Sequence, residues 1–396
     1  MRKNYRKTLT ACYLGFITQA ICANFAPLLF LKFHHDLGIP LGKIALIPMV
    51  FFFTQLLVDV FCAYVVDLIG YRQCVIVSEI ASGLGLAGLA VLPSLLPDPF
   101  IGILICVFLY AIGSGLIEVL VSPIVEACPF EHKDAVMSLL HSFYCWGWVG
   151  VTLLSTLFFA LFSLDQWRIL ACLWALIPLY NIYNFAVCPI ERLTEEGNGM
   201  SVGSLFRVPL FWLAVLLMVC AGASELSMAQ WASAYVEAAL GFSKTVGDLV
   251  GPCLFAVTMG VCRALYGKFG QRLNLETAMT ASAVLCVGCY LLASLAAAPV
   301  LGLIGCVCCG FSVGLMWPGT ISLVSPRLKN GGTALFAMLA MAGDLGGTCG
   351  PSLVGAITQH AGDRLQAGVL AGVVFPLVLL VVLICLRRKS AADEQP

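Results

Sequence analysis

Twelve apolar stretches follow one another along this chain, and each is long enough to cross a lipid bilayer as a helix. A helix rises about 1.5 Å per residue, so about 20 residues span the roughly 30 Å of hydrocarbon. The stretches cover residues 8–31, 44–66, 74–92, 100–125, 135–162, 168–188, 210–236, 247–266, 277–297, 300–324, 333–357 and 367–386. Because backbone polar groups find no water in the bilayer, this pattern predicts an all-α integral membrane protein with twelve transmembrane helices.

The composition agrees with burial in lipid and excludes other classes. Hydrophobic residues make up 61% of the 396 residues and charged residues only 11%, whereas a soluble domain carries about 25% charged residues. The 21 basic residues balance the 21 acidic ones without a long basic run, so no nucleic-acid partner is expected. The 19 cysteines lie in apolar stretches, with one cluster at Cys306, Cys308 and Cys309, and are interpreted as packing residues, not metal ligands or disulfides.

The basic residues are unevenly distributed between the expected helices. With a cytoplasmic N-terminus, 15 of the 21 Lys and Arg residues fall in cytoplasmic segments and five in outer segments, while Arg263 lies within a helix. The positive-inside rule therefore predicts a multi-pass protein of the plasma or inner membrane with both termini in the cytoplasm. Arg263 is expected to extend toward the cytoplasmic headgroups, and the alternative is that it binds the ligand.

The longest connection divides the helices into two sets of six. The resulting N-terminal bundle, cytoplasmic linker, C-terminal bundle and cytoplasmic tail are expected at residues 1–188, 189–209, 210–388 and 389–396. A shift of 200 residues places residues 67–72 on 267–272, and Gly147 and Gly150 on Gly347 and Gly350, which indicates an internal repeat. Two repeated six-helix units are typical of secondary transporters, whose substrate site lies near the bilayer midplane.

Short motifs strengthen this interpretation. The segment DLIGYR at 67–72 resembles the D-x-x-G-x-R loop signature of the major facilitator superfamily. Four further segments resemble the fucose permease (fucose:proton symporter) family, and they are Gly113 to Glu118 with Pro123, Leu140 to Phe143, Glu225 with Trp231 and Tyr235, and Met316 to Pro318. The resemblance implies two pseudo-symmetric six-helix bundles in the major facilitator fold, with proton-coupled transport by alternating access.

The resemblance also implies a role for Glu118 on the fourth expected helix. In the fucose permease family the acid at this position is protonated as substrate binds. The charged form of a carboxylate is disfavoured in a low dielectric, so such an acid can exchange protons. Glu118 also shares a helix face with Tyr110, Ser114, Ser122 and Glu126. The alternative is that hydrogen bonds hold Glu118 in one protonation state.

The chain departs from the family at two places. Members typically carry a second acid on the first helix, but residues 8–31 contain no Asp or Glu, and Gln19 and Asn24 are the strong polar groups there. His141 and Tyr144 replace the Gln and Asn of the family. Coupling is therefore expected to rest on Glu118 alone, to involve another acid or to be absent, and the binding site is expected to differ from one for fucose.

Two other acids lie within expected helices. Glu225 of the seventh helix and Asp344 of the eleventh are candidate proton carriers with Glu118, and Asp344 is alternatively a charge partner of Arg263 or His141. The candidate substrate-binding residues are Gln19, Asn24, Ser114, Glu118, His141, Tyr144, Trp148, Ser224, Glu225, Trp231, Tyr235 and Trp317.

Gating residues are expected in the repeated loops. In the resembled superfamily the loop after the second helix closes the cytoplasmic side by charge pairing between helices. The candidate gating residues are Asp67, Gly70, Arg72, Gly270, Arg272 and Asp59. Asp59 is interpreted either as part of the gate or as a residue that reaches the membrane interface.

The sequence therefore predicts a secondary active transporter, with proton-coupled symport of a small polar solute such as a monosaccharide or derivative. The alternative is a proton-independent facilitator or an exporter of amphiphilic compounds. No nucleophile lies beside a base, and no phosphate loop or metal cluster is present in the sequence pattern, so no enzyme activity and no cofactor besides the coupling proton are expected. The expected partners are the substrate, protons and the lipid bilayer, and one chain holding both halves predicts a functional monomer.

Overall fold

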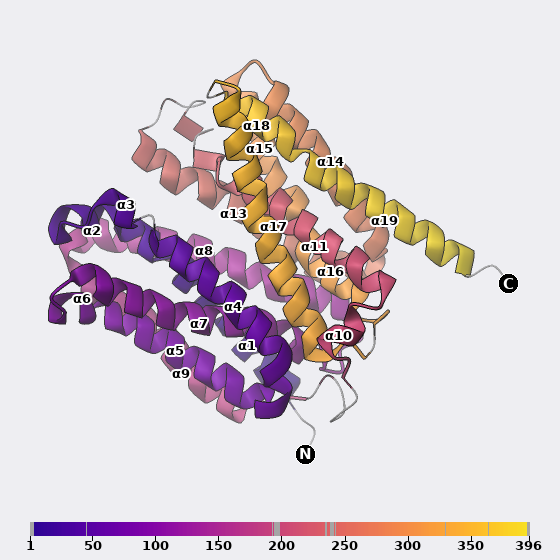
Figure 1. Ribbon diagram of the computed structural model, residues 1–396, viewed down its shortest axis with the longest axis horizontal. Helices are drawn as coiled ribbons and strands as arrows, with labels where there is room; N and C mark the ends of the chain where they lie inside the picture. The colour runs from indigo at the N-terminus through magenta and orange to yellow at the C-terminus, as the bar shows by residue number, and fades with distance from the viewer. Residues whose placement is uncertain are drawn as a thin grey trace. The chain divides into compact units, whose positions relative to one another are not determined.

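The computed structural model describes residues 4–44, 46–191, 193, 199–233, 236–237, 241, 243–328, 330–362 and 364–393. Within these residues the chain is helical and contains no strand (Figure 1). The chain forms two compact units. Unit 1 comprises residues 1–129, 143–202 and 330–337, and unit 2 comprises residues 130–142, 203–329 and 338–396.

The long helices of unit 1 are α1 (Tyr5–Asn24), α4 (Leu46–Ile69), α5 (Tyr71–Leu89), α7 (Pro99–Glu126) and α9 (Trp167–Val187). Its short helices are η1 (Ala26–Leu29), α2 (Phe30–Leu37), α3 (Leu41–Ile44), α6 (Leu92–Leu95) and η2 (Leu164–Gln166). The helices of unit 2 are α11 (Pro209–Ala229), α13 (Lys244–Phe269), η3 (Gly270–Arg272), α14 (Leu275–Leu295), α15 (Pro299–Val313), α16 (Met316–Val324), α18 (Leu365–Gly372) and α19 (Val374–Asp393). The short helix α10 (Val202–Leu205) precedes them. Helices α8 (Lys133–Phe162) and α17 (Gly332–His360) each pass from one unit to the other.

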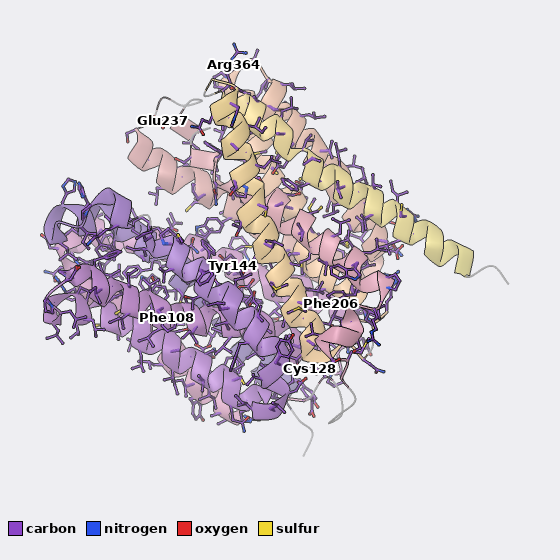
Figure 2. All side chains as sticks on the ribbon, viewed as in Figure 1. Phe108, Cys128, Tyr144, Phe206, Glu237 and Arg364 are labelled. Carbon is purple, nitrogen blue, oxygen red and sulfur yellow. The ribbon has the colours of Figure 1, made fainter. Side chains whose placement is uncertain are left out.

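The prediction of an all-α membrane protein is confirmed. In the described part of the chain, ten helical segments are long and apolar enough to span a membrane, and α5 and α17 cover the remaining two expected stretches. Large apolar side chains stay exposed along these helices, as Phe108 of α7 at 48% illustrates (Figure 2). Apolar surface on this scale is stable only against lipid or a partner, which agrees with a membrane environment.

Three expected helices are broken at or near prolines. Helix α1 ends at Asn24, and Pro27 follows in η1. The tenth expected helix divides into α15 and α16 because Pro318 has no N–H for the carbonyl of Gly314, four residues earlier. The twelfth divides into α18 and α19 in the same manner, four residues after Gly372, at Pro376.

The internal repeat is visible in how glycines pack within each unit. A Cβ atom on Gly147 of α8 would lie 2.8 Å from the Cβ of Ala20 on α1, and one on Gly347 of α17 would collide with the Leu226 side chain on α11. The fifth helix thus lies on the first, and the eleventh on the seventh. This matching contact supports two copies of one six-helix pattern.

Candidate functional site

Glu118 of α7 is hydrogen-bonded by two amides in unit 1. Gln19 Nε2 of α1 donates to Glu118 Oε2 over 2.9 Å, and Gln55 Nε2 of α4 donates to the same oxygen over 2.6 Å. Gln19 and Gln55 are 7% and 3% exposed. An amide carries both donors and an acceptor, so after rotating it can also accept a hydrogen bond from a protonated carboxyl group. These two partners can therefore satisfy either protonation state of Glu118.

The exposure of α7 singles out Glu118. From residue 113 to residue 126 every residue of this helix is buried except Glu118, which keeps intermediate exposure. The other members of its polar face, Tyr110, Ser114, Ser122 and Glu126, are buried in the protein. The carboxyl group is thus the one accessible polar point on this stretch of α7.

Small residues bring the amide partners to Glu118. A Cβ atom on Gly115 would lie 3.1 Å from the Val58 side chain and 3.3 Å from the Cα of Gln55, so the glycine allows α4 to approach α7. Gly15 lies one turn before Gln19 on α1, and its Cβ position is 3.4 Å from Val121 of α7. The close packing of α1 and α4 on α7 therefore positions Gln19 and Gln55.

The other predicted binding residues of unit 1 differ in their contacts. Asn24 Nδ2 donates to the carbonyl of Ala20 in its own helix over 2.9 Å. Ser114 is fully buried, and its Oγ has no hydrogen-bond partner. Tyr144, labelled in Figure 2, and Trp148 form an edge-to-face pair on α8 with ring centroids 6.5 Å apart. Both aromatic side chains keep intermediate exposure, and their role in substrate binding stays a prediction.

Unit 2 contains a buried ion pair between Arg263 of α13 and Glu225 of α11. Arg263 Nη2 lies 3.2 Å from Glu225 Oε2, and the two side chains are 4% and 13% exposed. The expectation that Arg263 extends to the headgroups is wrong, because the guanidinium finds a carboxylate and two carbonyls inside the unit. Arg263 Nη1 donates to the carbonyl of His141 over 3.2 Å, and Nε donates to that of Gly314 over 2.8 Å.

The break between α15 and α16 supplies one of these carbonyls. Pro318 cannot donate to Gly314, so the Gly314 oxygen stays open to the side of the helix and accepts from Arg263 Nε. A Cβ atom on Gly314 would lie 2.9 Å from the Cβ of Cys262, next to Arg263, so the glycine also allows α13 to come close. The segment from Gly314 to Pro318 therefore supplies both the carbonyl that binds Arg263 and the space for α13.

Asp344 of α17 is arranged differently from Glu225. Its Oδ2 atom is buried without a hydrogen-bond partner, while the residue as a whole keeps intermediate exposure. The preceding Gly343 packs directly against the ring of Trp317 on α16. The ion pair that the structure describes for Arg263 is with Glu225, and the proposed pairing of Asp344 with Arg263 or His141 stays a prediction.

The remaining predicted binding residues of unit 2 lie on or after α11. Ser224 is fully buried with its Oγ unpartnered, and its carbonyl accepts a hydrogen bond from Tyr290 over 2.8 Å. Helix α11 ends at Ala229, so Trp231 lies just beyond it, and its Nε1 is buried without a partner. Tyr235 lies outside the described residues.

The first predicted gating loop forms hydrogen bonds within unit 1. Thr333 Oγ1 at the start of α17 donates to Asp67 Oδ1 over 2.6 Å and is also in short contact with the Tyr71 hydroxyl. Arg72 donates from Nη1 to the carbonyls of Phe185 and Ala186 and from Nη2 to that of Cys188, at 2.6 to 2.8 Å. Arg72 therefore caps the end of α9, where the helix dipole favours a cation.

The repeated loop is not an equal copy of the first. Gly70 has φ +99°, a conformation that favours glycine, whereas Gly270 is at φ −56° in η3 and Arg272 is exposed. Asp59 is fully buried in α4, so the alternative that it reaches the membrane interface is wrong. The gating roles of all six residues stay predictions.

The sequence interpretation missed two polar residues of unit 1. Gln55 is the second amide on Glu118. Glu79 of α5 is 0% exposed and accepts hydrogen bonds from Asn181 and Thr18. Glu79 was detectable, because it is an acid inside the third apolar stretch. Gln55 was not, since nothing in the sequence indicates which residue of the second helix meets Glu118.

The family described as Major Facilitator Superfamily matches residues 11–351 of the chain. Among curated proteins no sequence matches. Solved structures similar to this chain include the E. coli fucose:proton symporter FucP, at 16% identity and TM-score 0.79, with 95% of this chain and 97% of that chain covered.

Two further structures share the fold. The proton:xylose symporter XylE, bound to 6-bromo-6-deoxy-D-glucose, is 12% identical with TM-score 0.80 and covers 96% of this chain and 95% of its own. The human organic anion transporter MFSD10 is 17% identical with TM-score 0.72 and covers 96% of this chain and 100% of its own. At these identities the likeness establishes the fold, and the substrates belong to those proteins.

Proposed function

Because this chain belongs to the Major Facilitator Superfamily and is a multi-pass membrane transporter, we propose that it couples the inward movement of protons to the uptake of a small polar solute. The solute class is a monosaccharide or a derivative of one. The mechanism is alternating access, in which the two six-helix halves expose one site to each side of the membrane in turn. Glu118 is the proton carrier of this proposal.

One observation carries the proposal, namely the pair of amides on the accessible carboxyl group of Glu118. Gln19 and Gln55 can donate to the carboxylate and, after rotating, accept from the protonated acid. A coupling residue needs this property, because it must be stable both with and without its proton. The intermediate exposure of Glu118 on an otherwise buried stretch of α7 gives protons and solute a point of access.

The other two candidate carriers have different surroundings. Glu225 is paired with the buried Arg263, and a proton on Glu225 would leave the guanidinium without its counter-charge. Its proposed role is therefore to hold Arg263. Asp344 has an unpartnered buried oxygen and lies next to Gly343, which packs on Trp317, and this unpartnered oxygen supports Asp344 as a further candidate acid.

A sugar is favoured over other small solutes by two features. The predicted binding residues combine amides and hydroxyls with the partly buried aromatic rings of Tyr144 and Trp148, and aromatic faces suit the C–H surface of a sugar ring. Among proteins of the same fold, FucP and XylE are named as proton symporters of fucose and xylose. The departures at His141 and Tyr144 make a sugar other than fucose the expected solute.

The test is uptake by the purified protein in lipid vesicles. L-fucose, D-xylose and D-glucose serve as radiolabelled probes, with sugar acids and amphiphiles added after a thermal-shift screen of the same protein. We expect accumulation only with an inward proton gradient, and E118Q should lose accumulation while still exchanging solute across the membrane. E131Q, which changes an exposed acid before α8, is the control. Equal uptake without a gradient would instead establish the facilitator.

The proposal also covers the orientation of the chain in the membrane and its oligomeric state. Both termini face the cytoplasm of a cell whose plasma or inner membrane holds the protein, as the distribution of Lys and Arg predicts. The working unit is a monomer. Reporter fusions at each terminus and the mass of the protein in detergent test these two statements separately.

A further inference from the structure

Glu79 is a buried acid that the proposed cycle does not use. It lies on α5 of unit 1 with 0% of its surface exposed. Asn181 Nδ2 of α9 donates to Glu79 Oε1 over 2.7 Å, and Thr18 Oγ1 of α1 donates to Oε2 over 3.2 Å. Both partners are neutral. A carboxylate is expensive to bury against neutral groups alone, so such an acid in a membrane helix indicates a function.

The surroundings of Glu79 contain no described cation that compensates it. The titratable groups that face it are the thiols of Cys12 and Cys22 on α1. The nearest basic residue along α5, Arg72, is bound to the carbonyls at the end of α9. On the side of α7, the residues that share the contact at Gly15 are apolar. Protonation of Glu79 therefore breaks no ion pair among the described residues.

The Thr18 hydroxyl fits both protonation states of Glu79. A hydroxyl donates one hydrogen bond and also accepts, so it can donate to the carboxylate or accept from the protonated acid. Asn181 donates in either case, because its Nδ2 also holds the carbonyl of Ala11 over 3.0 Å and its Oδ1 accepts from Asn184. Thr18 is therefore the partner that would respond to a proton on Glu79.

Adjacent residues of α1 connect the two acids. Thr18 donates to Glu79 and Gln19 donates to Glu118, so one helix presents neighbouring donors to both carboxyl groups. Any change in one hydrogen bond that shifts or turns α1 alters the other. Gly15, one turn earlier, keeps α1 close to both, because its Cβ position is 3.7 Å from Glu79 Oε1 and 3.6 Å from Ile117 on α7.

We propose that Glu79 is a second proton-binding site of this transporter, coupled to Glu118 through Thr18 and Gln19 of α1. The proposal rests on the proposed function for its meaning, since a second titrating acid matters only in a proton-coupled cycle. The ligand is a single proton, and Glu79 changes between carboxylate and carboxylic acid with no other bond made or broken.

Infrared difference titration of the purified protein in lipid vesicles tests the site without any solute. A protonated carboxyl group has a C=O stretching band that a carboxylate lacks. We expect such bands to grow as the pH is lowered in wild type and in the E131Q control, and the component that belongs to Glu79 to be missing in E79Q. In E118Q this component should persist with its midpoint displaced by about half a pH unit or more, roughly a threefold change in proton affinity.

Two results would overturn the proposal. Identical titrations of wild type and E79Q would make Glu79 a structural acid held in one state, and an unchanged midpoint in E118Q would remove the coupling through α1. T18V provides the second variant if E79Q does not fold, because it removes the hydroxyl alone and should displace the same midpoint. Since no transport is measured, failure here leaves the role of Glu118 intact, and failure of solute uptake leaves this titration valid.

Discussion

The buried pair of Arg263 and Glu225 gives the sharpest test of the energetics of unit 2. At 3.2 Å and an effective dielectric constant of about 20, the gross attraction between the two charges is about 5 kcal/mol. Removing one member leaves the other charge buried at 4% or 13% exposure, which costs about 3–5 kcal/mol. We therefore expect R263M and E225Q each to lower the free energy of unfolding by about 3–5 kcal/mol.

The double variant separates the charge pair from the other contacts of Arg263. R263M also leaves the carbonyls of His141 and Gly314 without this donor, and the double variant shares that loss. The double-mutant cycle cancels it, and we expect a coupling energy of at least about 2 kcal/mol. Reversible unfolding in mixed detergent micelles, followed by tryptophan fluorescence, supplies the four free energies.

An exposed ion pair of the same protein is the control. Lys43 and Asp98 are 3.8 Å apart with side chains 51% and 44% exposed, so the same cycle with K43A and D98A should give less than about 1 kcal/mol. If the Arg263–Glu225 coupling is no larger than that of the control, the guanidinium is not held by Glu225. The assignment of Glu225 as a counter-charge, and not a proton carrier, would then be refuted.

Three further changes test the packing and the hydrogen bonds. G346A of α17 should lower the melting temperature, because its new Cβ atom would collide with the backbone of Val219. The control is G355A, whose Cβ atom meets nothing within 4 Å and should leave the melting temperature unchanged. Equal melting temperatures of the two variants would contradict this packing. Q55L should reduce proton-driven accumulation more than solute binding, because it removes one amide from Glu118. Flux measures accumulation, and thermal shift with the same sugar measures binding. An equal loss of both would indicate that Gln55 is merely structural. T333V should loosen the start of α17 by removing the hydrogen bond to Asp67, at a cost of about 1 kcal/mol, and faster hydrogen exchange there would report it.

The membrane helices were predictable because the bilayer restricts the chain so strongly. Each apolar stretch of about 20 residues had to become a helix. The divisions at Pro318 and Pro376 were not predicted, because a proline such as Pro123 of α7 can also lie inside an unbroken helix. Helix partners were not predictable. The bonds to Glu118 join residues 63 and 99 positions apart, and their formation depends on which helix faces meet.

The position of Arg263 also depends on helix partners that one sequence does not reveal. A lone arginine within an apolar stretch is usually interpreted as reaching the headgroups, because a single chain does not display its carbonyl partners. Two local signals were nevertheless present, the proline at 318 that opens the Gly314 carbonyl and the acid at 225 on the preceding helix. Their meeting point depends on the packing of α11, α13 and α15, which no spacing rule supplies.

The two units have kept one helical pattern but hold their acids in different ways. In unit 1 the described partners of Glu118 and Glu79 include two amides and a hydroxyl that can donate to a carboxylate or accept from a carboxylic acid. In unit 2 Glu225 meets a guanidinium, which can only donate and is always charged. A proton on Glu118 or Glu79 can therefore be accommodated when their hydrogen bonds rearrange. A proton on Glu225 would instead remove this counter-charge from the buried guanidinium of Arg263. This difference favours unit 1 for the proposed proton coupling and favours Glu225 as the counter-charge of Arg263.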